Sequence, residues 1–261
     1  MIDAHCHLDS DRLGTSADAV VADARAIGVE DIVMAGVDPT GWAAQRELAR
    51  RLPRLHTVFG IHPQIIAELD CESLEAMYIA LEEALIAHRP VALGETGLDR
   101  LTPASKAALG PQTNAFREQL RLARRFELPV VLHLLRADEQ ALAVLGEEGL
   151  PAAGGVVHSF SGSAEFAKKL LALGLHLSFA GTLTFAQSRR LREAALITPA
   201  DRLLVETDTP DQTPVPHRGE PNRPALLPLV IAALAEVRGQ SFEALAELTA
   251  TNARRLFALP G

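Results

Sequence analysis

The chain has 261 residues, of which 48% are hydrophobic and 22% are charged, a composition that is typical of a globular fold and excludes a disordered or fibrous one. Its formal net charge of −8 argues against a large electrostatic contact with duplex nucleic acid, because phosphate contacts need clustered cations. The two cysteines, Cys6 and Cys71, are too few for a disulfide framework and lack the CxxC spacing of a structural zinc site.

The first residues lack a basic segment followed by an apolar one, and no stretch approaches the roughly 18 uninterrupted apolar residues that a membrane helix needs. We therefore expect a cytoplasmic protein without membrane contact, and we predict no stable protein partner. Single α/β barrels commonly have about this length, and the composition gives no reason to divide the chain. One domain over residues 1–261 is expected.

Short β-rich runs alternate with longer amphipathic runs along the whole chain. The predicted strands are 2–6, 31–35, 56–60, 91–95, 130–133, 155–158, 176–180 and 202–207. The predicted helices are 16–27, 40–51, 72–87, 112–126, 137–148, 163–173, 187–195 and 224–237, followed by two short helices at 241–248 and 250–257. Eight strands with helices between them predict an α/β fold, a single (β/α)8 TIM barrel with extra C-terminal helices.

The histidines gather where such a barrel carries its chemistry, at the C-terminal ends of the strands. Five of the nine fall at or just beyond predicted strand ends: His5, His7, His62, His133 and His158. His5 and His7 are two residues apart, so both face the same side of the strand, and Cys6 between them turns into the packing. Two hydrogen-bonded core histidines are the alternative, but the pairing favours metal ligands because buried imidazoles need partners.

Carboxylates follow two other predicted strands. VALGETGLD places Glu95 at the end of the fourth strand between two glycines, and RLLVETDTP places Glu206 and Asp208 on one side of the eighth. Four histidines with two or three carboxylates exceed what one catalytic zinc requires, so we predict two divalent metals that share a bridging ligand. None of the three lysines lies at a strand end, and Glu95 is therefore the predicted bridge.

Each of these residues also has a structural explanation when it is taken alone. His133 and His158 could be core residues, Glu95 an acid at a helix N-terminus, and Asp208 a turn residue. Their coincidence at strand ends favours ligands. His62 and Glu206 are predicted to orient a ligand, with a structural role left open. The donor types do not select one metal among Zn, Mn, Mg, Co and Ni.

These residues, in this order, resemble the TatD family of metal-dependent hydrolases within the wider amidohydrolase-like barrels. DAHCHLD resembles the family's DxHxHL opening, GIHP its GxHP, GETGLD its GExGLD, VVHSFSGS its HxFSGS, and ETDTPDQTPVPHRGEPNRP its ETDxP…RGxxNxP close. The resemblance implies a (β/α)8 barrel with two divalent metals, the first held by His5, His7, Glu95 and Asp208 and the second by Glu95, His133 and His158. It also implies TatD-type deoxyribonuclease activity.

Three positions depart from the family pattern. Leu135 stands where an arginine is frequent, with Arg136 one position later, and Gln64 stands where a second histidine is frequent. TPDQ replaces the more usual aromatic residue after the ETDxP proline. All three lie at the expected rim of the substrate site, so they affect the prediction of the substrate and not the prediction of the metal ligands.

We predict a phosphodiesterase or deoxyribonuclease that acts on DNA ends, single strands or small nucleotides rather than on long duplex, because the acidic chain can neutralise few phosphates. Asp208 is the predicted general base toward a metal-activated water, and Glu95 the predicted bridge. Substrate phosphate is expected to bind Arg136, Arg218 and Arg223, for each of which a structural role stays open. Two alternatives are an amidohydrolase that cleaves the C–N bond of a cyclic amide and a non-enzymatic metal-binding protein.

Overall fold

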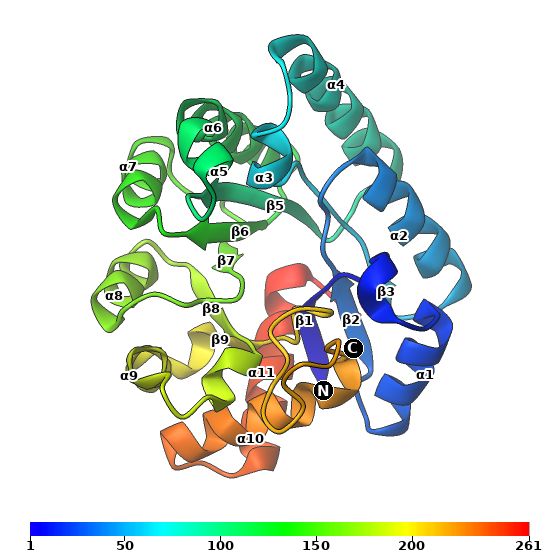
Figure 1. Cartoon of the computed structure of the whole chain (residues 1–261), viewed down its shortest axis with the longest axis vertical. Helices are drawn as coiled ribbons and strands as arrows, with labels where there is room; N and C mark the ends of the chain where they lie inside the picture. The colour runs from blue at the N-terminus through cyan, green and yellow to red at the C-terminus, as the bar shows by residue number, and fades with distance from the viewer. Residues whose placement is uncertain (261) are drawn as a thin grey trace.

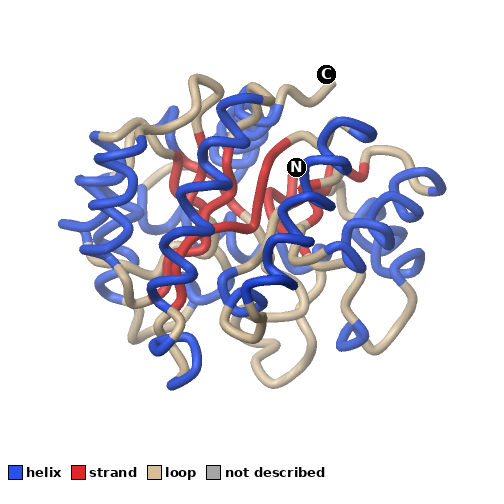
Figure 2. Tube along the Cα trace, turned by 90° about the horizontal axis from the view of Figure 1, so that it is seen from above, coloured by secondary structure: helices blue, strands red, loops and turns tan. Residues whose placement is uncertain are grey.

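The computed structural model describes residues 1–260. Its strands lie at the centre and its helices on the outside (Figures 1 and 2). All strand pairs are parallel. The strands are β1 (Ile2–Cys6), β2 (Asp31–Met34), β3 (Leu55–His56), β4 (Val58–Phe59), β5 (Ala92–Asp99), β6 (Val130–Leu135), β7 (Gly155–Val157), β8 (His176–Phe179) and β9 (Leu203–Val205).

The strands follow one another in chain order around the barrel. Hydrogen bonds group them into one sheet, β1-β2-β3, and a second that runs from β4 to β9. β3 and β4 are separated by Thr57 alone and together occupy the place of the predicted third strand. At the other junction the Asp208 N–H donates to the His5 carbonyl (3.0 Å) and the His7 N–H to the Thr209 carbonyl (2.8 Å). The predicted TIM-barrel fold is confirmed, with its third strand in two pieces.

The eight helices predicted to follow the strands begin and end within a few residues of the predicted ranges, whereas two short helices, Pro63–Ile66 and Pro103–Ala107, were not predicted. Several start at a short polar side chain that caps free N–H groups, as Ser16 does for the first helix and Asp70 for the fourth. The helices are α1 (Ala17–Ala26), α2 (Pro39–Arg51), α3 (Pro63–Ile66), α4 (Cys71–His88), α5 (Pro103–Ala107), α6 (Leu109–Arg125), α7 (Asp138–Glu148), α8 (Ala164–Ala172), α9 (Arg189–Ile197), α10 (Leu227–Arg238) and α11 (Phe242–Phe257), with short 3-10 turns η1 (Asp11–Leu13), η2 (Gly181–Thr184), η3 (Ala200–Arg202) and η4 (Pro224–Leu226).

The C-terminal segment differs from the prediction. The two short helices expected at 241–248 and 250–257 are one continuous helix, α11. The Thr249 hydroxyl donates to the Leu245 carbonyl (2.8 Å), so this side chain bonds within its own helix instead of ending it. Within residues 1–260 no single helix is long and apolar enough to cross a membrane, and only Pro224–Arg238 together with Phe242–Phe257 meets that test, as a pair bent by 108°.

An apolar layer fills the interior of the barrel toward the starts of the strands. It consists of Ile2, Ala4, Val33, Val58, Ala92, Val131, Val156 and Leu204, with Ala250, Ala253, Leu256 and Phe257 of α11 packed against them. α11 is fixed there because the Asn252 amide donates to the Leu203 carbonyl (2.9 Å) at the start of β9. A larger apolar cluster lies between the strands and the outer helices. The interior is thus closed at one end, and polar side chains gather at the other.

Candidate metal centre

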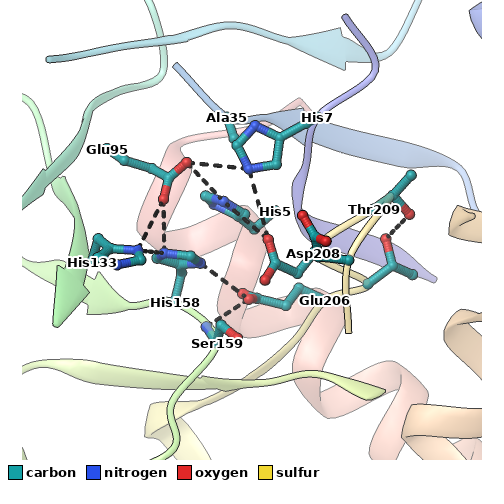
Figure 3. Close-up of polar contacts among 12 residues, drawn as sticks. His5, His7, Ala35, Glu95, His133, His158, Ser159, Glu206, Asp208 and Thr209 are labelled. Atoms are coloured by element: carbon teal, nitrogen blue, oxygen red, sulfur yellow. Dashed lines mark hydrogen bonds and ion pairs between the residues drawn. The ribbon is translucent and has the colours of Figure 1, made fainter. Parts of the chain in front are cut away.

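Polar side chains at the C-terminal ends of several strands lie together in one cluster (Figure 3). The structure brings all six predicted ligands together there: His5 and His7 from β1 and its end, Glu95 from β5, His133 from β6, His158 directly after β7, and Asp208 after β9. The cluster forms the base of a pocket of about 480 Å³, whose lining includes His7, Glu95, His133, His158 and Asp208.

Irregularities in β1 and β5 turn the ligands toward this pocket. Between Asp3 and Cys6 the register of β1 against β2 shifts, and β5 shifts in the same way against β6 between Leu93 and Thr96. An extra residue in one strand changes which face the following side chains point to, and such bulges are common beside functional sites. Cys6 consequently packs in the outer apolar cluster, as predicted, while its neighbours face the interior.

One group of ligand atoms surrounds the first oxygen of Glu95. His5 Nε2 and His7 Nε2 each lie 3.3 Å from Glu95 Oε1, and they lie 3.8 and 3.7 Å from Asp208 Oδ1. Ligands about 2.1 Å from a tetrahedral cation are separated by about 3.4 Å. The spacing of these four side chains therefore fits a single cation.

A second group surrounds the other oxygen of the same carboxylate. His158 Nε2 lies 2.8 Å and His133 Nδ1 3.6 Å from Glu95 Oε2, and the two ring nitrogens lie 3.1 Å apart. Two unprotonated ring nitrogens at this distance would place their lone pairs against each other, so a proton or a cation must lie between them. The two oxygens of Glu95 thus face two different groups of ligand atoms.

Unpaired buried atoms show that a cation fits the residues present. His5 Nε2 and Glu95 Oε1 are buried and form no hydrogen bond with any residue between Met1 and Pro260. A buried polar atom without a partner costs free energy, and a cation would provide the missing interaction for both. Imidazole nitrogen with carboxylate oxygen is a donor set that divalent transition metals and zinc accept.

Electrostatics hold the Glu95 carboxylate in its ionised form. Burial alone would raise the pKa of Glu95, but the neighbouring His158 and His5 outweigh it and hold that pKa well below its usual range. Burial would likewise lower the pKa of His158, yet the charges of Glu95 and Glu206 raise it well above its ordinary value. The buried Glu95 carboxylate is therefore stabilised by positive charge on neighbouring histidines, the kind of charge that a bound cation would also supply.

His62 lies beside the second group, where a role in orienting a ligand was predicted. Its Nδ1 accepts the Gln64 N–H (3.1 Å), and its Nε2 lies 3.6 Å from Glu95 Oε2. Burial, and then the charge of His133, lowers the pKa of His62 to about 3, so the ring is neutral near pH 7. With Nδ1 accepting, the proton of the neutral ring sits on Nε2 and faces Glu95. At 3.6 Å this is an electrostatic contact, too long for a hydrogen bond, and an orienting role for His62 stays a prediction.

Glu206 is fully buried behind His158. Its Oε1 accepts the Ser159 N–H (2.6 Å) and lies 3.5 Å from His158 Nδ1 (Figure 3). A carboxylate behind a ligating histidine fixes the orientation and tautomer of the ring, because it favours a proton on the nitrogen that faces it. The geometry agrees with the orienting role predicted for Glu206, which stays a prediction.

Asp99 lies behind His133 as Glu206 lies behind His158, and it was not predicted from the sequence. Its Oδ2 accepts from His133 Nε2 (3.1 Å) and from Gln64 Nε2 (2.9 Å), and its Oδ1 accepts the Leu101 N–H (2.7 Å). β5 does not end at residue 95 as predicted but continues to Asp99, whose register partner is Leu135 of β6. GETGLD ends in this aspartate, so the signal was present in the motif.

The predicted substrate arginines lie elsewhere. Arg136, Arg218 and Arg223 are exposed, and none of them lines the pocket. The Arg218 guanidinium lies over the Phe185 ring, 4.4 Å from its centre. The pocket is lined instead by Arg12 of η1, for which no role was predicted. A substrate role for the three predicted arginines stays a prediction.

Comparison with known proteins identifies the family. The sequence model of the TatD related DNase family matches residues 2–258. The chain belongs to the TatD family. Among TatD-family relatives, the uncharacterized metal-dependent hydrolase YabD of Bacillus subtilis (strain 168) is 36% identical over 258 residues, which cover 98% of each chain. The uncharacterized metal-dependent hydrolase YcfH of Escherichia coli (strain K12) is 38% identical over 98% of this chain and 95% of its own.

A solved TatD structure shows the same fold. The crystal structure of YJJV, a TatD homolog from Escherichia coli K12, superposes with a TM-score of 0.92 at 31% identity and covers 100% of this chain and 98% of that one. The predicted resemblance to the TatD family is confirmed, and the chain is a metal-dependent hydrolase of that family.

Proposed function

We propose that this TatD-family hydrolase cleaves phosphodiester bonds in DNA ends, single strands or small nucleotides, with two divalent cations in its centre. The observation that carries the proposal is the position of Glu95, whose two oxygens face separate groups of ligand atoms at 2.8 to 3.6 Å. Two adjacent cations suit phosphodiester hydrolysis, because they act on the attacking and the leaving oxygen together.

The two groups of ligand atoms define which residues would hold the cations. His5, His7, Asp208 and Glu95 Oε1 would hold one, and Glu95 Oε2, His133 and His158 the other. Zn, Mn, Mg, Co and Ni are all compatible with these donors. When bound, such cations lower the pKa of a water and stabilise negative charge on phosphoryl oxygens.

Asp208 is the proposed general base. Its carboxylate lines the pocket beside His5 and His7, and its backbone is fixed by the hydrogen bond to the His5 carbonyl (3.0 Å). A carboxylate so placed can accept the proton of a water that attacks phosphorus. Glu206 and Asp99 keep His158 and His133 in place behind it.

The variant Asp208→Asn tests the base role. Because general-base catalysis is worth about 10²- to 10⁴-fold, we expect turnover of single-stranded DNA and of a chromogenic phosphodiester to fall by that factor while metal content is retained. Asp201→Asn, an exposed carboxylate in η3 near the start of β9, is the matched control. Near wild-type turnover of metal-loaded Asp208→Asn would remove Asp208 from this role.

A second candidate function is hydrolysis of the C–N bond of a cyclic amide. It is favoured by the absence of Arg136, Arg218 and Arg223 from the described pocket lining, which leaves Arg12 as its one arginine within residues 1–260. Neutral substrates need no cluster of cations. Turnover assays with single-stranded DNA, a chromogenic phosphodiester and a cyclic amide separate the two functions, and activity on the amide alone would overturn the phosphodiesterase proposal.

A further inference from the structure

An arginine and an aspartate meet at the mouth of the pocket. Arg12 belongs to η1, five residues after His7, and Asp211 follows Asp208 by three residues. The Arg12 guanidinium donates to both carboxylate oxygens of Asp211, at 2.8 and 2.5 Å. Both side chains line the pocket, and Asp211 is the residue that replaces the aromatic usual in the TatD pattern. The pair therefore joins the two loops that follow β1 and β9.

Arg12 contributes a permanent positive charge to the lining of the pocket. Within residues 1–260 the pocket lining contains a single arginine, no lysine and five carboxylates, which are Asp9, Asp38, Glu95, Asp208 and Asp211. Apart from cations bound in the centre, Arg12 is thus the one permanent positive charge that this described lining offers to an anionic substrate. Arginine suits this task, because its planar guanidinium binds carboxylate and phosphate oxygens in the same bidentate manner.

The guanidinium is available for exchange. The side chains of Arg12 and Asp211 are 65% and 53% exposed, and solvent-exposed pairs of this kind contribute little to stability. A phosphate that takes the place of the Asp211 carboxylate therefore faces a small cost. By contrast, the side chains of Glu95 and His158 in the centre are 2% and 4% exposed. Arg12 thus lies at the rim, away from the buried centre where the bond would break.

We propose that Arg12 binds a phosphate of the substrate adjacent to the one that reacts. Asp211 holds the Arg12 guanidinium at the mouth until that phosphate takes the place of the Asp211 carboxylate. The inference rests on the proposed phosphodiesterase function and specifies its substrate class: a nucleotide chain with at least one phosphate beyond the reacting phosphodiester. The competing explanation is that the pair only fastens the two loops together.

Substrates that differ by one phosphate test the proposal. TpT contains a single phosphodiester, and pTpT and TpTp carry the same bond with an added phosphate at the 5′ or 3′ end. We expect the wild-type protein to prefer one of the phosphorylated dinucleotides, and Arg12→Ala to lower kcat/KM for it about tenfold through KM. Turnover of TpT should change less than twofold. Arg12→Lys should restore part of the loss, since it keeps the charge without the bidentate contact.

Asp211→Asn distinguishes phosphate binding from loop fastening. If Arg12 binds phosphate, removal of the Asp211 charge frees the guanidinium, and kcat/KM for the phosphorylated dinucleotide is retained or raised. If the pair only fastens the loops, Arg12→Ala and Asp211→Asn lose activity together and on TpT as well, which would overturn the proposal. Arg50→Ala is the matched control, because Arg50 forms an equally exposed bidentate pair with Glu47 outside the pocket lining.

A binding measurement separates failure of this proposal from failure of the proposed function. Fluorescence anisotropy of a labelled single-stranded oligothymidylate is measured on metal-loaded Asp208→Asn with and without Arg12→Ala. Loss of one phosphate contact should weaken binding about tenfold and reduce the slope of log affinity against log salt by about 0.7. If the metal-loaded wild-type protein hydrolyses no phosphodiester, the proposed phosphodiesterase function fails. Unchanged oligonucleotide affinity and slope in Arg12→Ala would overturn the proposal for Arg12.

Discussion

Replacing Asp99 perturbs one half of the centre without removing a ligand. Asp99 Oδ2 accepts from His133 Nε2 (3.1 Å), which leaves Nδ1 of the same ring to face Glu95 and His158. Burial would raise the pKa of Asp99, but the hydrogen bonds from His133 and from the Leu101 N–H hold it below its usual range. The residue is therefore an ionised acceptor near pH 7. Loss of such support behind a ligating histidine lowers metal affinity about 10- to 100-fold, or by about 1.4 to 2.8 kcal/mol.

The assay is a competitive titration of Asp99→Asn with a metal-binding dye. Because the amide keeps one acceptor oxygen but not the charge, we expect one cation to bind about 10- to 100-fold more weakly and the other to bind as in the wild type. Ser105→Ala is the control, since it removes a donor to Asp99 Oδ1 (3.2 Å) and leaves the contact with His133. Wild-type affinity for both cations in Asp99→Asn would refute the orienting role.

Two further predictions concern stability. Burial lowers the pKa of His176 to about 4 from a usual 6.5, so the unfolded chain binds a proton at this residue before the folded chain does as the pH falls. The free energy of unfolding should therefore fall by about 2 kcal/mol between pH 7 and pH 5. Urea unfolding of His176→Gln should lack that fall. In Gly60→Ala the added Cβ would lie 2.4 Å from the Gly94 carbonyl carbon, so we expect a lower Tm and a cost of about 3 kcal/mol. Gly110→Ala, where a Cβ meets nothing within 4 Å and alanine is the better helix former, should keep or raise the Tm, and equal Tm values for the two variants would contradict the packing argument.

The positions of the predicted ligands followed from the sequence because the fold dictates them. In a parallel barrel every strand ends at the same rim, so a histidine or carboxylate that closes an apolar run must face the others. His5, His133, His158 and Asp208 each follow this pattern, and the structure brings them within contact distance of one another or of Glu95. The connecting helices could also be predicted, because the spacing of apolar residues in an amphipathic helix is visible within its own sequence.

The residues that were missed depend on contacts that local patterns do not contain. Arg12 and Asp211 are 199 positions apart, and either alone is an ordinary exposed charge. Asp99 was overlooked because β5 continues past Glu95 through Gly97, and glycine normally weakens a strand. The break predicted within α11 failed for a different reason, since threonine has a weak helix propensity but Thr249 bonds to its own helix.

Metal content measures the central claim most directly, namely that the two oxygens of Glu95 serve two cations. After equilibration with a divalent metal and removal of the excess, elemental analysis of the wild-type protein should give two ions per chain. Glu95→Ala should retain at most one, because each group of ligand atoms loses an oxygen. One ion per wild-type chain, or two ions retained by Glu95→Ala, would contradict the account.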